Sequence, residues 1–254
     1  MKHKITTLLL LVTACLSLGT LAFAQDEKPN FQAMLQLIDE RSNFSDDLAM
    51  NLTINSTDPD DGDTTTQFQM FRRDADDMFL LLIQRPETQL GQGYLRVDES
   101  LWFYDPESRQ FNFTSLSESF QGSDARNSDW EASSLAEDYK VVSSVEGKLG
   151  KFDVWELELE ALHDEVTYPF LKMSVTKDNN LVLKSQEYSL TKRLLRTSYY
   201  PSYAKAGDNF IADKIIFVDE LVENKKTTVD FSDLSISPIP DNVFTKAYVE
   251  RVNR

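Results

Sequence analysis

The residues best suited to acid–base chemistry in this sequence are a histidine and its acidic neighbours. His163 directly precedes Asp164, and the only other histidine, His3, lies near the start of the chain. A histidine and an aspartate can form the base and the orienting acid of a hydrolase. Neighbouring strand residues point to opposite faces, however, and no Gly-x-Ser-x-Gly motif presents a serine. We therefore predict that His163 is a structural surface residue and that the protein is not an enzyme.

Metal and phosphate chemistry has even less support. Cys15 is the only cysteine, and a single further histidine supplies too few ligands for zinc. The acidic stretch 58–63 suggests calcium, but an EF-hand loop needs its glycine one place later than Gly62 and a distal glutamate. No glycine-rich phosphate loop occurs. The sequence predicts no cofactor and no metal, and it makes Asp61-Gly62 a hairpin turn.

What remains is apolar surface with a regular pattern. The chain has 16 Phe, 9 Tyr and 3 Trp, many at alternating positions, and residues 101–106 read Leu-Trp-Phe-Tyr-Asp-Pro. Such side chains can fill a core or line a cavity for an apolar ligand, and the sequence leaves both interpretations open. The candidate cavity residues are Met50, Leu52, Ile54, Phe68, Met70, Leu101, Phe103, Phe111, Phe113, Trp155, Leu157 and Leu159. Trp102 and Tyr104 point to the other face of their strand and can pack beneath helices.

The elements that must position these side chains are mostly strands. Residues 49–55, 64–73, 78–84 and 152–162 alternate or run apolar, and further strand patterns continue to residue 234. Helical spacing occurs in 29–40, with Pro29 in the first turn, and more briefly in 133–140 behind a serine cap. The C-terminal stretch predicts a turn and a short helix. We expect ten to eleven strands in an antiparallel meander, as one domain.

The first 24 residues have the pattern of a signal peptide. Lys2 and Lys4 precede an apolar run that ends at Ala22-Phe23-Ala24. A retained membrane anchor, or lipidation at Cys15, is the minority interpretation. Removal of residues 1–24 would leave a domain of residues 25–254 and change the net charge from −16 to −18. That charge argues against nucleic acid and anionic membrane surfaces, and no later stretch is apolar enough to span a bilayer.

A series of short motifs, in order, resembles one protein family. Arg85-Pro86 follows an apolar strand, Gly91-Gln92-Gly93 opens the next strand, and the segment 101–106 follows with Trp102, Tyr104 and Pro106. Gly122-Ser123-Asp124, the stretch 135–140, Tyr168-Pro169 and the late stretch 238–251 complete the series. The sequence thus resembles the outer-membrane lipoprotein-sorting proteins, relatives of the carrier LolA and the receptor LolB.

This resemblance implies a fold and a role. The fold would be mainly β (α+β), a single curved antiparallel sheet forming an open half-barrel, with a few short helices packed on or across its concave side. The role would be that of a monomeric periplasmic carrier for the acyl chains of lipoproteins or similar lipids in Gram-negative bacteria. An inner-membrane exporter would load it, and an outer-membrane acceptor would unload it. A periplasmic sensor of lipid or lipoprotein, or an accessory to a hydrophobe exporter, is the alternative.

A flexible rim would be needed for release of cargo. Residues 114–132 are polar and irregular, yet contain Phe120 and Trp130. We predict that this segment is a lid over the cavity.

Overall fold

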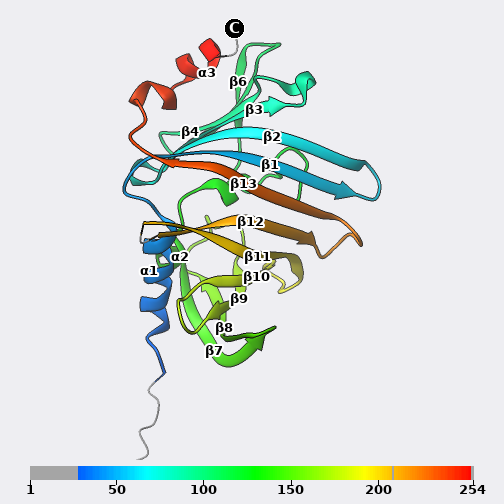
Figure 1. Ribbon diagram of the computed structural model, residues 1–254. Coiled ribbons are helices and arrows are strands. Elements are labelled where there is room, and N and C mark those ends of the chain that lie inside the picture. Colours follow the sequence, from blue (N-terminus) through cyan, green and yellow to red (C-terminus); the bar gives the residue numbers. More distant parts are fainter. Residues whose placement is uncertain (1–27, 208, 253–254) are drawn as a thin grey trace, which may run out of the picture.

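The computed structural model describes residues 28–207 and 209–252, which form one large sheet with helices on both faces (Figure 1). The predicted signal peptide 1–24 and Cys15 lie outside the described residues. The strands are β1 (Leu48–Asp58), β2 (Gly62–Arg73), β3 (Met78–Arg85), β4 (Gly93–Val97), β5 (Ser100–Asp105), β6 (Gln110–Thr114), β7 (Tyr139–Leu149), β8 (Phe152–Ala161), β9 (Phe170–Thr176), β10 (Val182–Tyr188), β11 (Leu194–Ala206), β12 (Asn209–Asp219) and β13 (Lys226–Ile236). The α-helices are α1 (Phe31–Ser42), α2 (Leu135–Asp138) and α3 (Lys246–Val252), and the 3₁₀ helices are η1 (Asp74–Asp76), η2 (Glu87–Gln89), η3 (Asn127–Trp130) and η4 (Asp241–Phe244).

The thirteen strands follow the order β6-β5-β4-β3-β2-β1-β13-β12-β11-β10-β9-β8-β7. Every neighbouring pair is antiparallel, and the curved sheet stays open, which confirms the predicted fold class. The expected count of ten to eleven strands was too low. The strand β7 escaped prediction because it is an edge strand with Val142 and Val145 exposed, so its alternation of apolar and polar residues is weak.

Local chemistry explains where the first helix and the first turn begin. The side chain of Asn30 accepts a hydrogen bond from the Ala33 amide, so α1 starts after Asn30, and Pro29 lies before the helix and not in its first turn. Met34, Leu35 and Ile38 form the buried side of α1, as the spacing predicted. The β1–β2 turn spans three residues, 59–61, and is followed by Gly62 with a φ of 84°, so Asp61 and Gly62 do not form a two-residue turn.

Two different covers lie on the inner face of the sheet. The helices α1 and α2 pack against β7 to β10, where Leu35, Trp155 and Met173 belong to one buried cluster. The inner loop, residues 115–132, packs against β1 to β5, where Phe120 and Trp130 join a second cluster. On the outer face, η4 and α3 cover β3 to β5 (Figure 1). The middle strands of the sheet lie between the two inner covers.

Candidate ligand-binding cavity

A cavity of about 1550 Å³ lies on the inner face, between the two covers. Its floor is formed by β10 to β13, where neither α1 nor the inner loop covers the sheet completely. Seven apolar residues of the sheet form much of its wall: Met50, Met70, Phe210, Ile211, Ile215, Phe217 and Phe231. Trp130 of the inner loop and Ile38 of α1 line it from the two covers. The space therefore exists because the two covers leave the centre of a wide sheet free.

Only Met50 and Met70 of the predicted cavity residues line this cavity. Five others, Leu52, Ile54, Phe68, Leu101 and Phe103, share the inner face with them but pack within the cluster that the inner loop covers. Phe120 is fully buried there, with its ring 5.0 Å from Phe68 and 4.6 Å from Tyr94. The inner loop thus occupies the part of the inner face where the sequence placed the cavity.

Trp155, Leu157 and Leu159 also lie on the inner face, beneath α1 and not in the cavity. They are buried in the cluster of the helical cover, and the ring of Trp155 lies 5.1 Å from that of Phe31. For these three residues, the structure shows core packing.

Phe111 and Phe113 lie on the outer face, so the prediction that they share a cavity with Leu101 and Phe103 is wrong. Trp102 pairs with Phe113 and Tyr104 with Phe111 across the β5–β6 ladder, and directly paired residues point to the same side. Phe113 is 68% exposed.

The positions of the family motif lie near this outer surface. Tyr104 is buried beneath η4 and α3, while the Lys246 ammonium lies 3.2 Å from the centre of the Trp102 ring. Pro106 lies in the β5–β6 turn. Arg85 and Pro86 are joined by a cis peptide bond at the end of β3, and Arg85 forms an exposed ion pair with Glu87. None of these five motif residues lines the cavity.

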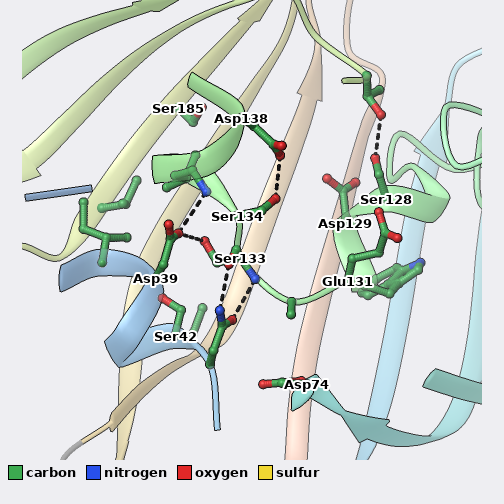
Figure 2. Close-up of a pocket in the computed structure, with 18 of the residues that line it drawn as sticks. Asp39, Ser42, Asp74, Ser128, Asp129, Glu131, Ser133, Ser134, Asp138 and Ser185 are labelled. Carbon is green, nitrogen blue, oxygen red and sulfur yellow. Dashed lines mark hydrogen bonds between the residues drawn. The ribbon is translucent and has the colours of Figure 1, made fainter. Parts of the chain in front are cut away.

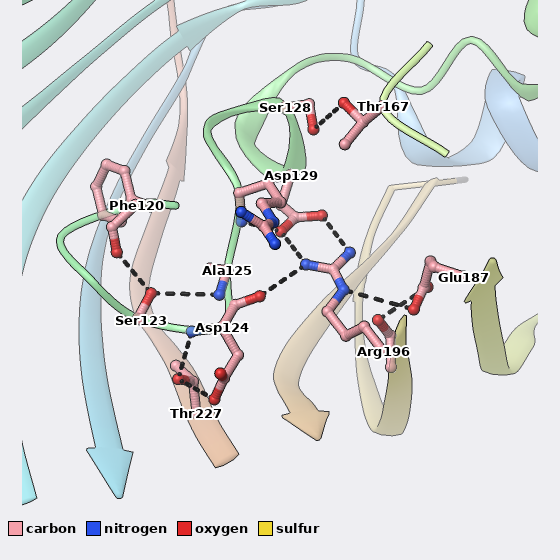
Figure 3. Close-up of polar contacts among 12 residues, drawn as sticks. Phe120, Ser123, Asp124, Ala125, Ser128, Asp129, Thr167, Glu187, Arg196 and Thr227 are labelled. Atoms are coloured by element: carbon pink, nitrogen blue, oxygen red, sulfur yellow. Dashed lines mark hydrogen bonds and ion pairs between the residues drawn. The ribbon is translucent and has the colours of Figure 1, made fainter. Parts of the chain in front are cut away.

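A buried arginine joins the inner loop to the cavity floor (Figure 3). Arg196 of β11 donates to both carboxylate oxygens of Asp129, at 2.6 and 2.9 Å, and to the carbonyl oxygen of Asp124 at 3.0 Å. Its Nε lies 3.4 Å from a carboxylate oxygen of Glu187 on β10. Thr227 of β13 holds the same loop through the amide and carboxylate of Asp124. A bidentate pair of this kind is strong and directional.

Glu187 is the most perturbed acid of the cavity floor. Burial raises its pKa to about 7, against the opposing effects of Arg196 and the Ser198 hydroxyl. Burial also raises the pKa of Asp124. The part of the floor from β10 and β11 is thus polar around Glu187 and Arg196, whereas the part from β12 and β13 is apolar.

The start of α2 is held by a side chain from α1 (Figure 2). The carboxylate of Asp39 accepts hydrogen bonds from the amides of Leu135 and Ala136 and from the Ser133 hydroxyl. The side chain of Ser134, the residue at the N-cap position, makes no hydrogen bond to the helix backbone and donates instead to Asp138. Burial raises the pKa of Asp39 despite these hydrogen bonds. The contact attaches the two helices of this cover to each other.

His163 lies at the cavity border but lacks the arrangement of a catalytic base. Its Nε2 is 2.9 Å from Asp138, and the Ser134 hydroxyl donates to the other oxygen of the same aspartate. The acid therefore stands between the serine and the histidine, so the imidazole does not reach the hydroxyl proton as a base must. Within the described residues, no group of three or more His, Cys, Asp or Glu is arranged to hold a metal ion.

The border of the cavity is acidic. Five exposed carboxylates line it: Glu40, Asp77, Glu99, Glu137 and Glu165. Arg72 and Arg96 lie nearby, but each forms an ion pair, with Asp74 and Glu131. Across residues 28–207 and 209–252, no helix has the length and apolar character to cross a membrane.

Sequence reasoning identified β11 and β12 as strands but did not place their residues in the cavity wall. Tyr200 and Tyr203 come from β11, and Phe210, Ile211 and Ile215 come from β12. The signal was present, because both segments read as strands rich in aromatic and branched residues. What the sequence did not contain is the position of the inner loop, which decides which part of the inner face stays open.

Comparisons with known proteins agree with this architecture. A family model described as "-like: Uncharacterized protein" matches residues 75–251. A LolA superfamily protein from Nitrosomonas europaea is 26% identical, with a TM-score of 0.74, over 85% of this chain and 98% of that one. An outer membrane lipoprotein-sorting protein domain from Vibrio parahaemolyticus is 20% identical, with a TM-score of 0.77, over 87% of this chain and 98% of that one. No curated protein matches the sequence. The chain therefore belongs to the family of the matching model, and its structural relatives are LolA-superfamily, outer-membrane lipoprotein-sorting proteins.

Proposed function

We propose that this protein is a periplasmic carrier that shelters the acyl chains of a lipoprotein, or of a similar lipid, in the cavity over β10 to β13. The single observation that carries the proposal is the large cavity, apolar along β12 and β13, on an inner face that the protein leaves partly uncovered. No bond needs to be made or broken for this role, and the order of Ser134, Asp138 and His163 offers no nucleophile and base.

The energetics of the cargo explain why such a cavity is useful. Each methylene group moved out of water is worth about 0.8 kcal/mol, so a chain of about sixteen carbons gains on the order of 10 kcal/mol from shelter. The cavity of about 1550 Å³ is larger than the roughly 300–1,000 Å³ of most small-molecule sites. Its size supports a bulky, flexible ligand such as an acyl chain.

We further propose the inner loop as the lid. Its main-chain hydrogen bonds are largely internal, such as those from Phe120 to Ala125 and from Ser128 to Leu116. It is attached to the sheet mainly by side chains, above all Arg196 and Thr227. A segment held in this way can lift without breaking a strand ladder, which would expose the apolar face around Phe68 and Leu101 to additional acyl chains.

The acidic border suggests how partners are recognised. The exposed carboxylates around the cavity favour docking on basic surfaces and slow encounter with acidic ones. We propose an inner-membrane exporter and an outer-membrane acceptor with basic docking surfaces as the partners that load and unload the carrier.

Native mass spectrometry of the protein with a synthetic triacylated lipopeptide tests the proposal. We expect a one-to-one complex, and we expect Ile215→Glu to weaken it at least tenfold, because this change places a charge in the apolar wall. Ile216→Glu is the matched control, since Ile216 is the next residue of β12 and points to the outer face. Equal binding by both variants, or a wild-type protein that ignores the lipopeptide, would reject the carrier.

A further inference from the structure

Three consecutive hairpin turns on one rim of the sheet each contain an exposed leucine. Leu162 lies in the β8–β9 turn, Leu190 in the β10–β11 turn and Leu221 in the β12–β13 turn. These side chains are 54%, 77% and 47% exposed. The strand register places all three turns at the same end of the strands, because Glu160 pairs with Phe170, Tyr188 with Leu194, and Val218 with Lys226.

The spacing of the strands places the three leucines in a row along the rim. Successive turns on this rim are separated by two strands, or roughly 10 Å. Each turn on this rim between β8 and β13 therefore contributes one leucine to the row. The next turn along this rim joins β1 to β2 (Figure 1). It contains Asp60 and Asp61 and no leucine, so the row of leucines ends before it.

The proportion of basic to acidic residues in these turns is close to that of the whole chain. The three turns together carry three basic side chains, Lys192, Arg193 and Lys225, against four acidic ones, Asp164, Glu165, Glu220 and Glu223. The whole chain carries 26 basic and 42 acidic residues. Among the three turns, the β10–β11 turn stands apart, because its charged residues are Lys192 and Arg193 and it contains no acidic residue. The tip that carries Leu190 is therefore repelled less by anionic surfaces than the two other tips are.

The row lies beside the cavity border. His163 and Glu165, which follow Leu162 in the β8–β9 turn, both line the cavity. A surface that contacts the tips of these turns would thus lie next to the space where acyl chains are held.

We propose that the leucines of these three turns dock the protein on the surface of a lipid bilayer, with Leu190 as the deepest anchor. An exposed leucine gains from transfer into the interfacial region of a bilayer, and three such side chains give weak, reversible attachment. Adjacent basic side chains, Lys192 and Arg193, lie at the level of the headgroups in this orientation. The inference rests on the proposed carrier role and adds the place where acyl chains pass between protein and membrane.

Flotation with vesicles of phosphatidylcholine and phosphatidylethanolamine tests the docking. The wild-type protein should float with the vesicles, and Leu190→Gln should lower the partition coefficient about tenfold. Leu190→Gln combined with Leu221→Gln should lower it about a hundredfold. The matched control is Val145→Gln, because Val145 is 56% exposed but lies within β7, away from the rim.

Lipopeptide binding, measured on the same variants, separates this inference from the carrier proposal. The leucine variants should bind the lipopeptide like the wild type, because these side chains do not line the cavity. A wild type that binds the lipopeptide but does not float, or leucine variants that float as well as the wild type, would overturn the docking rim while the carrier stands. Docking on a protein partner would give the first of these results.

Discussion

At the scale of single residues, the buried pair of Arg196 and Glu187 is the most unusual feature. Arg196 is shared between Asp129 of the inner loop and Glu187 of β10, so its one positive charge faces two carboxylates. Removal of charges from water is unfavourable, and a shared partner compensates only part of it. The excess negative charge is consistent with the raised pKa of Glu187, about 7, for which burial is the main cause.

Because the pKa of Glu187 is raised, we predict that the free energy of unfolding falls as pH rises. Glu187 is neutral in both states below its ordinary pKa of 4.5, and between 4.5 and about 7 the folded protein retains the proton more tightly than the unfolded chain. Stability should therefore decrease across this window, by on the order of 3 kcal/mol from this residue alone. Denaturant unfolding of the wild type and of Glu187→Gln at both ends of the window measures the effect.

The comparison isolates one residue because the other acids are the same in both proteins. The variant should lose less stability than the wild type as pH rises. Equal losses would show that Glu187 has an ordinary pKa.

At the scale of elements, much of the architecture could be predicted from periodicity. Alternation identified most strands, and the spacing of Met34, Leu35 and Ile38 identified α1 and its buried side. The site was less predictable. Alternation assigns a side chain to a face but does not tell which part of that face another segment covers, and the irregular inner loop has no period from which to place it. Phe111 and Phe113 were misplaced because the register that pairs them with Tyr104 and Trp102 was unknown.

The contact between α1 and α2 gives a prediction at this scale. Asp39 caps α2 from another helix, so Asp39→Ala leaves two amides and the Ser133 hydroxyl without their acceptor. We expect a loss of about 1–2 kcal/mol in the free energy of unfolding, measured with urea. Ser134→Ala serves as the control and should change stability by less than about 0.5 kcal/mol, since its side chain does not cap the helix. A larger effect from Ser134 than from Asp39 would refute the assignment of the cap.

At the scale of the whole molecule, net charge is the dominant property. A formal charge of −16 makes the folded chain repel itself, and salt screens this repulsion. Thermal unfolding should therefore occur at a higher temperature as sodium chloride increases from about 0.01 M to about 0.5 M. Calorimetry at constant pH measures the shift, and a falling transition temperature would mean that internal ion pairs, such as that of Arg73 and Asp47, outweigh the repulsion.

Ser133 lies where the inner loop meets α2, and its attachment limits how the two covers can move relative to each other. One continuous segment supplies the inner loop and then α2, and Ser133 connects them. The Asn43 side chain binds both the amide and the carbonyl of Ser133, each at 2.7 Å, which fixes this point to the end of α1. An inner loop that opened as proposed would pivot at Ser133, and the helical cover would keep its place. The proposed opening would then widen the cavity in one direction only, and ligands of different size would contact the same stationary helical side.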